Sequence, residues 1–410
     1  MQQNAYVAGV GMTTFGKHMD RGLKSLAGEA ITEALADAGL GIADLNAAYM
    51  GNAAAAVITG QVCVPGQMVL RSLGVGRIPV VNVENACATA ATAFQQAATM
   101  ITAGLYDVVL ACGSEKLYHE DKQRTFSVFT GAVDVESMAA VMAGINQRLQ
   151  ASGGGQDSAG SGTSRSLFMD IYAAWALDHM RRYGTTREQF AAVSAKNSVH
   201  GSLNPKAQFR DRISVEDVLG AREVAWPLTL PMCSPIGDGA AAAVLVSERK
   251  ARALGMQRMV RVQASQVFSG WDYGEGEETV AAGCARELYE SAGIGPAELD
   301  CVELHDASAP SEIMYYEYLG LCKAGEGGPF VEAGHSSLGG RVPVNTSGGL
   351  MRKGHPIGAT GIAQIVELTQ QLRGEAGERQ VADARVALAE NGGGFIGNDA
   401  AALVLTLLSQ

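Results

Sequence analysis

The chain has 410 residues, enough to bury a large core and to form more than one domain. A hydrophobic share of 47% with 18% charged residues excludes a disordered chain, and a net charge of −11 argues against nucleic acid as a partner. Seven cysteines without Cys-x-x-Cys pairs argue against a disulfide framework or a metal site. The sequence shows no secretory leader and no apolar run long enough for a membrane, so we expect a cytoplasmic protein without a membrane partner.

Strands and helices are predicted to alternate through the first third of the chain. β-Branched and alternating segments predict strands over about 4–11, 46–51, 78–83 and 107–112. Apolar residues at helical spacing predict helices over about 23–38, 60–73 and 88–103. This alternation predicts an α/β architecture around a central sheet.

The chain also contains an internal repeat. Residues 38–46 resemble residues 292–300, and each copy follows a predicted helix and leads into a strand. Residues 237–246 resemble residues 397–405 in the same way. The sequence therefore predicts two similar α/β halves.

The chain from the first repeated segment to the second is longer in the first copy (from 38–46 to 237–246) than in the second (from 292–300 to 397–405). This difference predicts an insertion in the first copy, after the strand that contains Cys112. We therefore expect a first half formed by residues 1–114 and 233–250, a loop domain over 115–232, and a second half over 251–410. The insertion includes a Gly/Ser-rich stretch near residues 152–162, which is typical of a mobile loop.

Cys87 lies where a predicted strand turns into a predicted helix. Residues 88–103 are rich in Ala, Gln and Met and end before Gly104. The unpaired N–H groups and the dipole of a helix N-terminus favour the thiolate, which is the nucleophilic form of cysteine. The position therefore suits a nucleophile, although free cysteine is also common as a small buried residue.

Three segments of the second half offer groups that such a nucleophile needs. His305 follows the predicted strand 301–304, and His355 lies in a glycine-rich stretch where the backbone can approach a substrate closely. Residues 390–394, Glu-Asn-Gly-Gly-Gly, predict a turn after the strand 385–389, and its N–H groups can form half of an oxyanion hole. We expect these groups to meet Cys87 where the two halves join.

Several of these stretches carry a resemblance to a known family. They are the Cys87 turn, Met-Cys-Ser-Pro-Ile-Gly-Asp-Gly-Ala at 232–240, the pair His305-Asp306, and 345–361 with its Gly-His-Pro-Ile-Gly-Ala-Thr-Gly motif. The chain resembles the thiolase superfamily, and most of all the thiolases related to sterol carrier protein X, from residue 4 to 408. The resemblance implies a five-layered αβαβα fold of two similar halves, an inserted loop domain that helps to bind coenzyme A, and a homodimer or tetramer.

The resemblance also implies a role for each site residue. Cys87 would carry the acyl group as a thioester, and His355 would activate Cys87 and donate to an oxyanion hole. His305 would share that hole and polarise the thioester oxygen of the enolate-forming substrate. The backbone N–H groups of Cys87 and Gly392 would hold the oxyanion of the acyl-enzyme step. Coenzyme A and acyl-CoA would be substrates, with no permanently bound cofactor.

The sequence departs from the family pattern at the second catalytic cysteine. The family places this acid/base either two positions after the histidine of His-Asp, where this chain has Ala307, or in a Cys-x-Gly turn, where it has Glu390. One hypothesis makes Glu390 the acid/base, because a buried carboxyl has a raised pKa; the alternative is a structural or recognition role.

Two other hypotheses remain, and the first of them needs no second acid/base. Cys87, His305 and His355 are similar to the set of decarboxylating ketosynthases, in which loss of CO₂ creates the enolate. Alternatively, the chain is a thiolase-like subunit that is active only with a small zinc-ribbon/OB-fold partner protein. The identity of the acyl chain is not encoded in any motif of the sequence.

Overall fold

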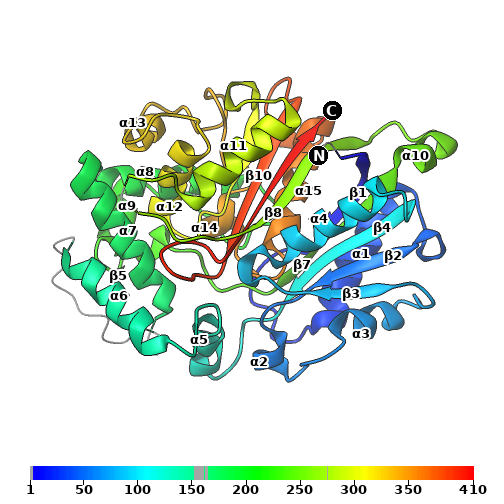
Figure 1. The fold of residues 1–410 in the computed structure, drawn as a ribbon, viewed down its shortest axis with the longest axis horizontal. Helices are drawn as coiled ribbons and strands as arrows, with labels where there is room; N and C mark the ends of the chain where they lie inside the picture. The colour runs from blue at the N-terminus through cyan, green and yellow to red at the C-terminus, as the bar shows by residue number, and fades with distance from the viewer. Residues whose placement is uncertain (1–2, 152–160, 162–164, 275) are drawn as a thin grey trace.

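A mixed sheet forms the framework of the molecule (Figure 1). The computed structural model describes residues 3–151, 161, 165–274 and 276–410. Within them, nine strands pair in the order β3-β2-β4-β7-β1-β8-β11-β10-β9. The strands are β1 (Ala5–Met12), β2 (Ala47–Gly51), β3 (Val80–Val83), β4 (Val108–Glu115), β7 (Gly239–Ser247), β8 (Val260–Ser269), β9 (Cys301–Glu303), β10 (Val386–Gly393) and β11 (Ala402–Ser409).

Helices cover the sheet and link its strands (Figure 1). They are α1 (Leu23–Ala38), α2 (Ala55–Thr59), α3 (Pro65–Ser72), α4 (Thr89–Thr102), α5 (Lys122–Thr130), α6 (Met138–Ala151), α7 (Leu167–Tyr183), α8 (Arg187–Ser202), α9 (Val215–Gly220), α10 (Glu248–Leu254), α11 (Val280–Ala292), α12 (Ala309–Tyr318), α13 (Gly327–Glu332), α14 (Gly349–Lys353) and α15 (Thr360–Arg373). None of the described helices is long and apolar enough to cross a bilayer.

The strand order reads as two like halves that meet at the middle of the sheet. β1 pairs with β8 at the centre of the sheet. On one side β7 pairs antiparallel with β1 and then with β4, and on the other side β11 pairs antiparallel with β8 and then with β10. β2 and β9 then run parallel to β4 and β10, and a bridge between Val302 and Val344 takes the place of β3 in the second half. The predicted duplication is therefore visible in the pairing of the strands.

The repeated sequence has the same local structure in both copies. Gly39 ends α1 and Gly293 ends α11, with φ of 65° and 67°, in the left-handed region that favours glycine. A short 3₁₀ turn follows each glycine and leads into β2 or β9. The predicted helix over 60–73 was wrong in its extent, because Gly60 ends α2 and Pro65 begins α3.

Alternation along the strands separates five layers. On β7, Ala242 and Val244 pack with α1 and α3 outside the sheet, whereas Ala243 and Leu245 pack with α4 and α15 inside. The outer face of the second half packs against α11 and α12. The central helices α4 and α15 thus lie between the two halves of the sheet, which confirms the expected αβαβα fold.

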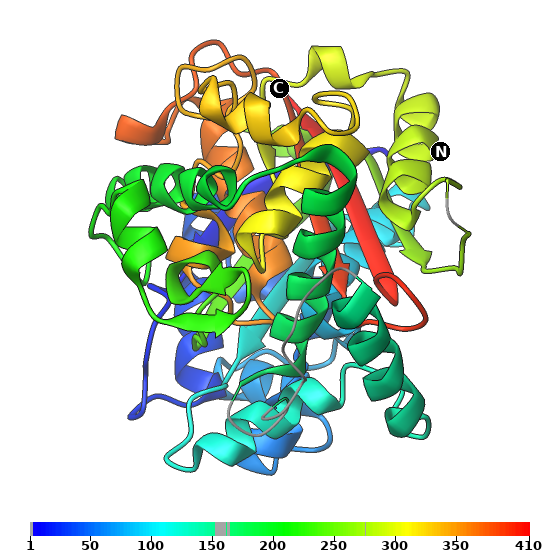
Figure 2. The ribbon, with the colours of Figure 1, turned by 90° about the vertical axis from the view of Figure 1, so that its left-hand side faces the viewer.

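The stretch from 115 to 232 contains α5–α9 and a small hairpin formed by β5 (Glu223–Ala225) and β6 (Leu228–Thr229). These helices gather on one side of the molecule, and in Figure 2 that side faces the viewer. The buried faces of α7 and α8 share a hydrophobic cluster with α11 and α12, so this stretch is packed onto the second half. The domain boundaries remain a prediction, and most of the Gly/Ser-rich loop near 152–162 lies outside the described residues.

Candidate active site

The Cys87 turn joins β3 to α4. Residues 86–88 form one 3₁₀ turn, and Ala86 has a positive φ of 49°, which is unfavourable for a residue with a side chain. The backbone N–H of Asn85 donates to Thr89 Oγ1 at 2.9 Å, and the Asn85 side chain donates to Thr92. These bonds hold Cys87 in a strained turn at the start of a central helix.

Two histidines meet Cys87 from the other half of the chain. His305 follows β9, and His355 precedes α15. The Cys87 Sγ and a ring nitrogen of each histidine all lie within 4.8 Å of one another. The imidazole rings have centroids 5.1 Å apart and are nearly perpendicular. The structure therefore brings together three of the four side chains that the sequence singled out.

A hydrogen bond assigns the tautomer of His355. The Thr360 hydroxyl donates its one hydrogen to the carbonyl of Pro356 at 3.1 Å. In that arrangement the hydroxyl accepts the 2.8 Å bond from His355, so we assign the proton to Nδ1 and a free lone pair to Nε2. Burial and the neighbouring His305 and Lys353 lower the pKa of His355 well below its usual range. His355 is thus a neutral base at rest.

His305 is also neutral, and part of its ring lacks a partner. Burial lowers the pKa of His305 to about 4. Its Nε2 atom is buried and has no hydrogen-bond partner among the described residues. An unpaired buried polar atom is costly, and an oxygen of a bound substrate can satisfy it.

The Cys87 thiol is protonated at rest, contrary to the expectation from the helix N-terminus. Burial raises the pKa of Cys87 to about 12, and the carboxylates of Glu115 and Glu84 add to the rise. The backbone N–H groups of Cys87 and Gly394 lower the pKa, but they do not outweigh the desolvation. A ring nitrogen of His355, a possible acceptor of the thiol proton, lies within 4.8 Å of the sulfur.

The glycine-rich segment after residue 389 belongs to a strand, and the predicted turn was wrong. β10 continues through Gly393 because Glu390–Gly393 pair with Ala402–Leu405 of β11. A Cβ at Gly393 would lie 2.2 Å from the Asn85 carbonyl oxygen, so the Cys87 turn can approach β10 only at a glycine. The N–H of Gly392 lies near the Glu390 carboxyl, whereas that of Gly394 favours the Cys87 thiolate.

Glu390 lies behind the three-residue cluster. Its Oε2 accepts a 2.8 Å hydrogen bond from the backbone N–H of His305, and its Oε1 is buried without a partner among the described residues. Burial raises the pKa of Glu390 to about 8, although the His305 N–H and the Tyr315 hydroxyl lower it. The carboxyl is therefore largely protonated at neutral pH.

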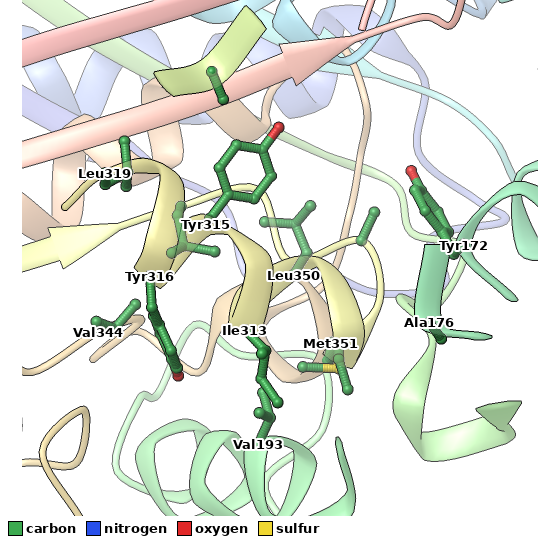
Figure 3. Packing of buried hydrophobic residues seen from close by; sticks show 14 of the residues in the cluster. Tyr172, Ala176, Val193, Ile313, Tyr315, Tyr316, Leu319, Val344, Leu350 and Met351 are labelled. Carbon is green, nitrogen blue, oxygen red and sulfur yellow. The ribbon is translucent and has the colours of Figure 1, made fainter. Parts of the chain in front are cut away.

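Tyr315 lies between Glu390 and the cavity beside Cys87, and sequence reasoning did not identify it. Tyr315 and Tyr316 of α12 point to opposite sides of the helix, and Tyr315 points toward the C-terminal strands (Figure 3). A Cβ at Gly392 would lie 3.3 Å from the Tyr315 hydroxyl and 3.6 Å from Glu390 Oε1. The Tyr315 hydroxyl and the Glu390 carboxyl therefore both lie near Gly392 of β10.

The cavity at Cys87 is small and largely aromatic. Its volume is about 30 Å³, and it is lined by Cys87, His305 and Gly392–Gly394 together with side chains of α7 and α12. Three aromatic rings form a chain along its wall, with centroids 5.5 Å apart between Tyr172 and Trp175 and 6.2 Å apart between Trp175 and Phe395.

Glu115 at the end of β4 is a second residue that the sequence did not reveal. Its buried carboxylate accepts hydrogen bonds from one side-chain amide and four backbone N–H groups, those of Asn52, Ala53, Ala54, Lys116 and Gly358. Burial raises the pKa of Glu115 to about 7 against the effect of these donors. The carboxyl ties the first half to the loop that follows His355.

Cys87, His305 and His355 also form the one group of side chains, among the described residues, that could hold a metal ion. Cys87, His305 and His355 supply one sulfur and two nitrogens, a donor set that zinc accepts. Sequence spacing could not predict this, because the three residues are far apart in the chain.

The fold and the cluster define an acyltransferase built on two like α/β halves. Residues 5–224 match the family described as "Thiolase, N-terminal domain", and residues 274–406 match "Thiolase C-terminal domain-like". The chain belongs to the thiolase family, as the sequence motifs indicated.

Curated relatives agree with this assignment. Sterol carrier protein 2 from Homo sapiens is 36% identical over 402 residues, covering 95% of this chain and 70% of that protein. Acetyl-CoA acetyltransferase from Methanothermobacter thermautotrophicus is 38% identical over 401 residues, covering 96% and 97%. Benzoylsuccinyl-CoA thiolase subunit BbsB from Thauera aromatica is 36% identical over 403 residues, covering 96% of each chain. The chain is thus an enzyme of the thiolase type, and its likeness to sterol carrier protein 2 confirms the predicted branch.

Two solved structures share the fold. A structure described as an Ltp2-ChsH2(DUF35) aldolase has a TM-score of 0.78 and 25% identity, covering 100% of this chain and 98% of that one. The Acat5 thiolase from Ascaris suum, in complex with coenzyme A, has a TM-score of 0.70 and 17% identity over the full length of both chains. The second likeness supports the fold alone.

Proposed function

We propose that the protein is a thiolase that cleaves or forms 3-oxoacyl-CoA through an acyl group on Cys87. The observation that carries this proposal is the position of the Cys87 thiol within 4.8 Å of two neutral histidines, one of which is hydrogen-bonded to Thr360 through Nδ1. The names of the acetyl-CoA acetyltransferase and benzoylsuccinyl-CoA thiolase relatives support acyl-CoA and coenzyme A as substrates.

The chemistry follows from the protonation states. The Cys87 thiol gives its proton to His355 Nε2 as the sulfur attacks the 3-keto carbon of the substrate. The C2–C3 bond then breaks, and the electron pair moves into the enolate of the leaving thioester. His305 can donate to that enolate oxygen from Nε2, and backbone N–H groups at the Cys87 turn hold the oxyanion of the acyl step. Coenzyme A finally takes the acyl group from Cys87.

The enolate carbon must also gain a proton, and we assign this step to Glu390 together with Tyr315. The Glu390 carboxyl occupies the family's second-cysteine position, is protonated at neutral pH, and has a free oxygen near Gly392. The Tyr315 hydroxyl lines the cavity and can pass the proton. The competing role for Glu390 is structural, since its other oxygen accepts the N–H of His305.

Intact-mass spectrometry after incubation with a panel of 3-oxoacyl-CoAs tests the proposal. The wild-type protein is expected to gain an acyl-sized mass, and the Cys87→Ala variant is expected to gain none. Glu390→Gln keeps the shape and an acceptor for the His305 N–H, so it should still be acylated but should lose turnover. Near-normal turnover of Glu390→Gln would exclude the acid/base role. Absence of any adduct both with the purified chain and after addition of host lysate, which supplies a partner protein, would refute the acyl-enzyme.

The absence of both family cysteines also suits a decarboxylating condensation. In that reaction the loss of CO₂ creates the enolate, so Cys87, His305 and His355 suffice. A malonyl-type donor distinguishes the two reactions, because only the decarboxylating enzyme releases CO₂ as it condenses. Condensation of such a donor without CO₂ release would exclude this candidate.

A small partner protein is a further element of the proposed function. The description of the Ltp2-ChsH2(DUF35) structure names two components, and that structure matches the whole chain. We infer that this protein also works with a small partner of the zinc-ribbon/OB-fold type, and that it forms a homodimer or tetramer. Full activity of the purified chain alone would exclude an obligate partner, and its mass in solution measures the oligomer.

A further inference from the structure

A second, larger cavity lies next to the one at Cys87. Its volume is about 260 Å³, and it lies between one face of α6, one face of α7 and residues 395–397. Ile171, Trp175 and Phe395 line both cavities, so the two share a wall of apolar side chains. The larger cavity therefore lies on the path that a long acyl group on Cys87 would take beyond these side chains.

The lining of the larger cavity is apolar apart from its ends. Along α6 the side facing it carries Val141, Gly144 and Ile145, and α7 adds Ala174. An engineered apolar cavity of about 150 Å³ holds benzene. The volume of 260 Å³ therefore suits one ring and several further carbon atoms.

Arg148 gives this cavity a positive charge at the C-terminal end of α6. In the described part of the chain, its guanidinium has no hydrogen bond or ion pair, and Asp399 is a charge near enough to interact with it. Asp399 already accepts hydrogen bonds from the Tyr273 hydroxyl and the Ala400 N–H. The other acid of the lining, Asp134, accepts two backbone N–H groups at the start of α6. Arg148 is thus the lining charge that remains available for a ligand.

We propose that this cavity binds the far end of the acyl group, and that it selects acyl chains with a ring and a terminal carboxylate that contacts Arg148. This inference rests on the proposed function, because it names the substrate class of the same site. A guanidinium binds a carboxylate through two parallel N–H···O bonds, which makes it selective for that group.

Gly144 offers a matched pair of variants that test the cavity. A Cβ at Gly144 meets no atom within 4 Å, so a larger side chain there would project into open space. Gly144→Leu should fill the cavity, whereas Gly144→Ala makes the same change to the helix backbone and leaves most of the volume free. The kcat/KM is measured with acetoacetyl-CoA, 3-oxo-5-phenylpentanoyl-CoA and the para-carboxy derivative of the latter.

We expect Gly144→Leu to lower kcat/KM at least tenfold for both ring substrates and to leave acetoacetyl-CoA unchanged, while Gly144→Ala changes none of them. Arg148→Gln should lower kcat/KM about tenfold or more for the carboxylated substrate alone, as expected for loss of a charged hydrogen bond. Equal loss with all substrates, or a raised KM for coenzyme A itself, would assign Arg148 to the coenzyme and overturn the inference.

The outcome for the proposed function is read separately. If no 3-oxoacyl-CoA acylates Cys87 in the wild-type protein, either purified or in host lysate that supplies a partner protein, the proposed function fails. If Cys87 is acylated but neither the ring nor the carboxylate raises kcat/KM over acetoacetyl-CoA, only the inference about the larger cavity fails.

Discussion

Replacing Thr360 with valine tests whether the tautomer of His355 controls formation of the Cys87 thiolate. Valine has the shape of threonine but cannot accept the 2.8 Å hydrogen bond from His355 Nδ1. Both side chains are buried, so the N–H would lose its partner without gaining water. An unsatisfied buried donor costs about 1–3 kcal/mol, which corresponds to a fall in the acylation rate of about 5- to 150-fold.

The assay is the single-turnover rate of acyl transfer to Cys87, measured by quenched mass spectrometry across pH. Thr360→Ser is the matched control, because it keeps the hydroxyl and should keep most of the rate. Thermal unfolding of both variants separates loss of the hydrogen bond from loss of the fold. If Thr360→Val acylates as fast as the wild-type protein, Thr360 does not position the base and the tautomer argument is wrong.

Three other predictions concern the thiol, the close approach of β10 and a buried ion pair. Because the pKa of Cys87 is raised to about 12, the rate of its reaction with iodoacetamide should keep rising with pH above 9; a plateau below that pH would contradict the raised pKa. Gly393→Ala would place a Cβ 2.2 Å from the Asn85 carbonyl oxygen. Acylation, measured by mass spectrometry, should fall sharply, and the free energy of unfolding, measured in urea, should fall by about 1–3 kcal/mol. Normal acylation would show that the Cys87 turn tolerates the contact. Lys353→Met should destabilise the protein by about 3–5 kcal/mol in the same unfolding assay, because it removes the cation from a fully buried ion pair with Glu303. An unchanged midpoint would show that this ion pair does not stabilise the fold.

The fold was predictable because local sequence patterns indicate its helices and strands, and because these patterns occur in both halves of the chain. Gly39 and Gly293 each end a helix in the left-handed region, and both repeats lead into equivalent strands. The extent of β10 was not predictable in the same way. A run of glycines normally indicates a turn, but here it is a strand because it pairs with β11, and the close approach of the Cys87 turn requires glycine at 393. That approach joins segments about 300 positions apart, which no local pattern reports.

The sequence motifs predicted which residues form the site, but not the electrostatic properties of those residues. The motif around His355 and the pair His305-Asp306 pointed to residues that the structure brings together with Cys87, but the pKa of Cys87 depends on desolvation by the assembled fold. The carboxyl of Glu115 contributes to that effect, and its hydrogen bonds reach residues 61 and 243 positions away. The hydrophobic periodicity of a sequence gives no information about contacts between distant residues. An acidic residue at the end of a strand is also usually solvated, so nothing in the sequence indicated that Glu115 is buried.

The symmetry of the sheet has a consequence for the catalytic pair. α4 connects β3 to β4, and α15 connects the strand-like residue Val344 to β10, so the two helices are counterparts in the two halves. Cys87 precedes one of them and His355 precedes the other. The proposed nucleophile and its base thus occupy equivalent places in the two halves. Each half contributes one of the two groups, so neither half could form the cluster on its own.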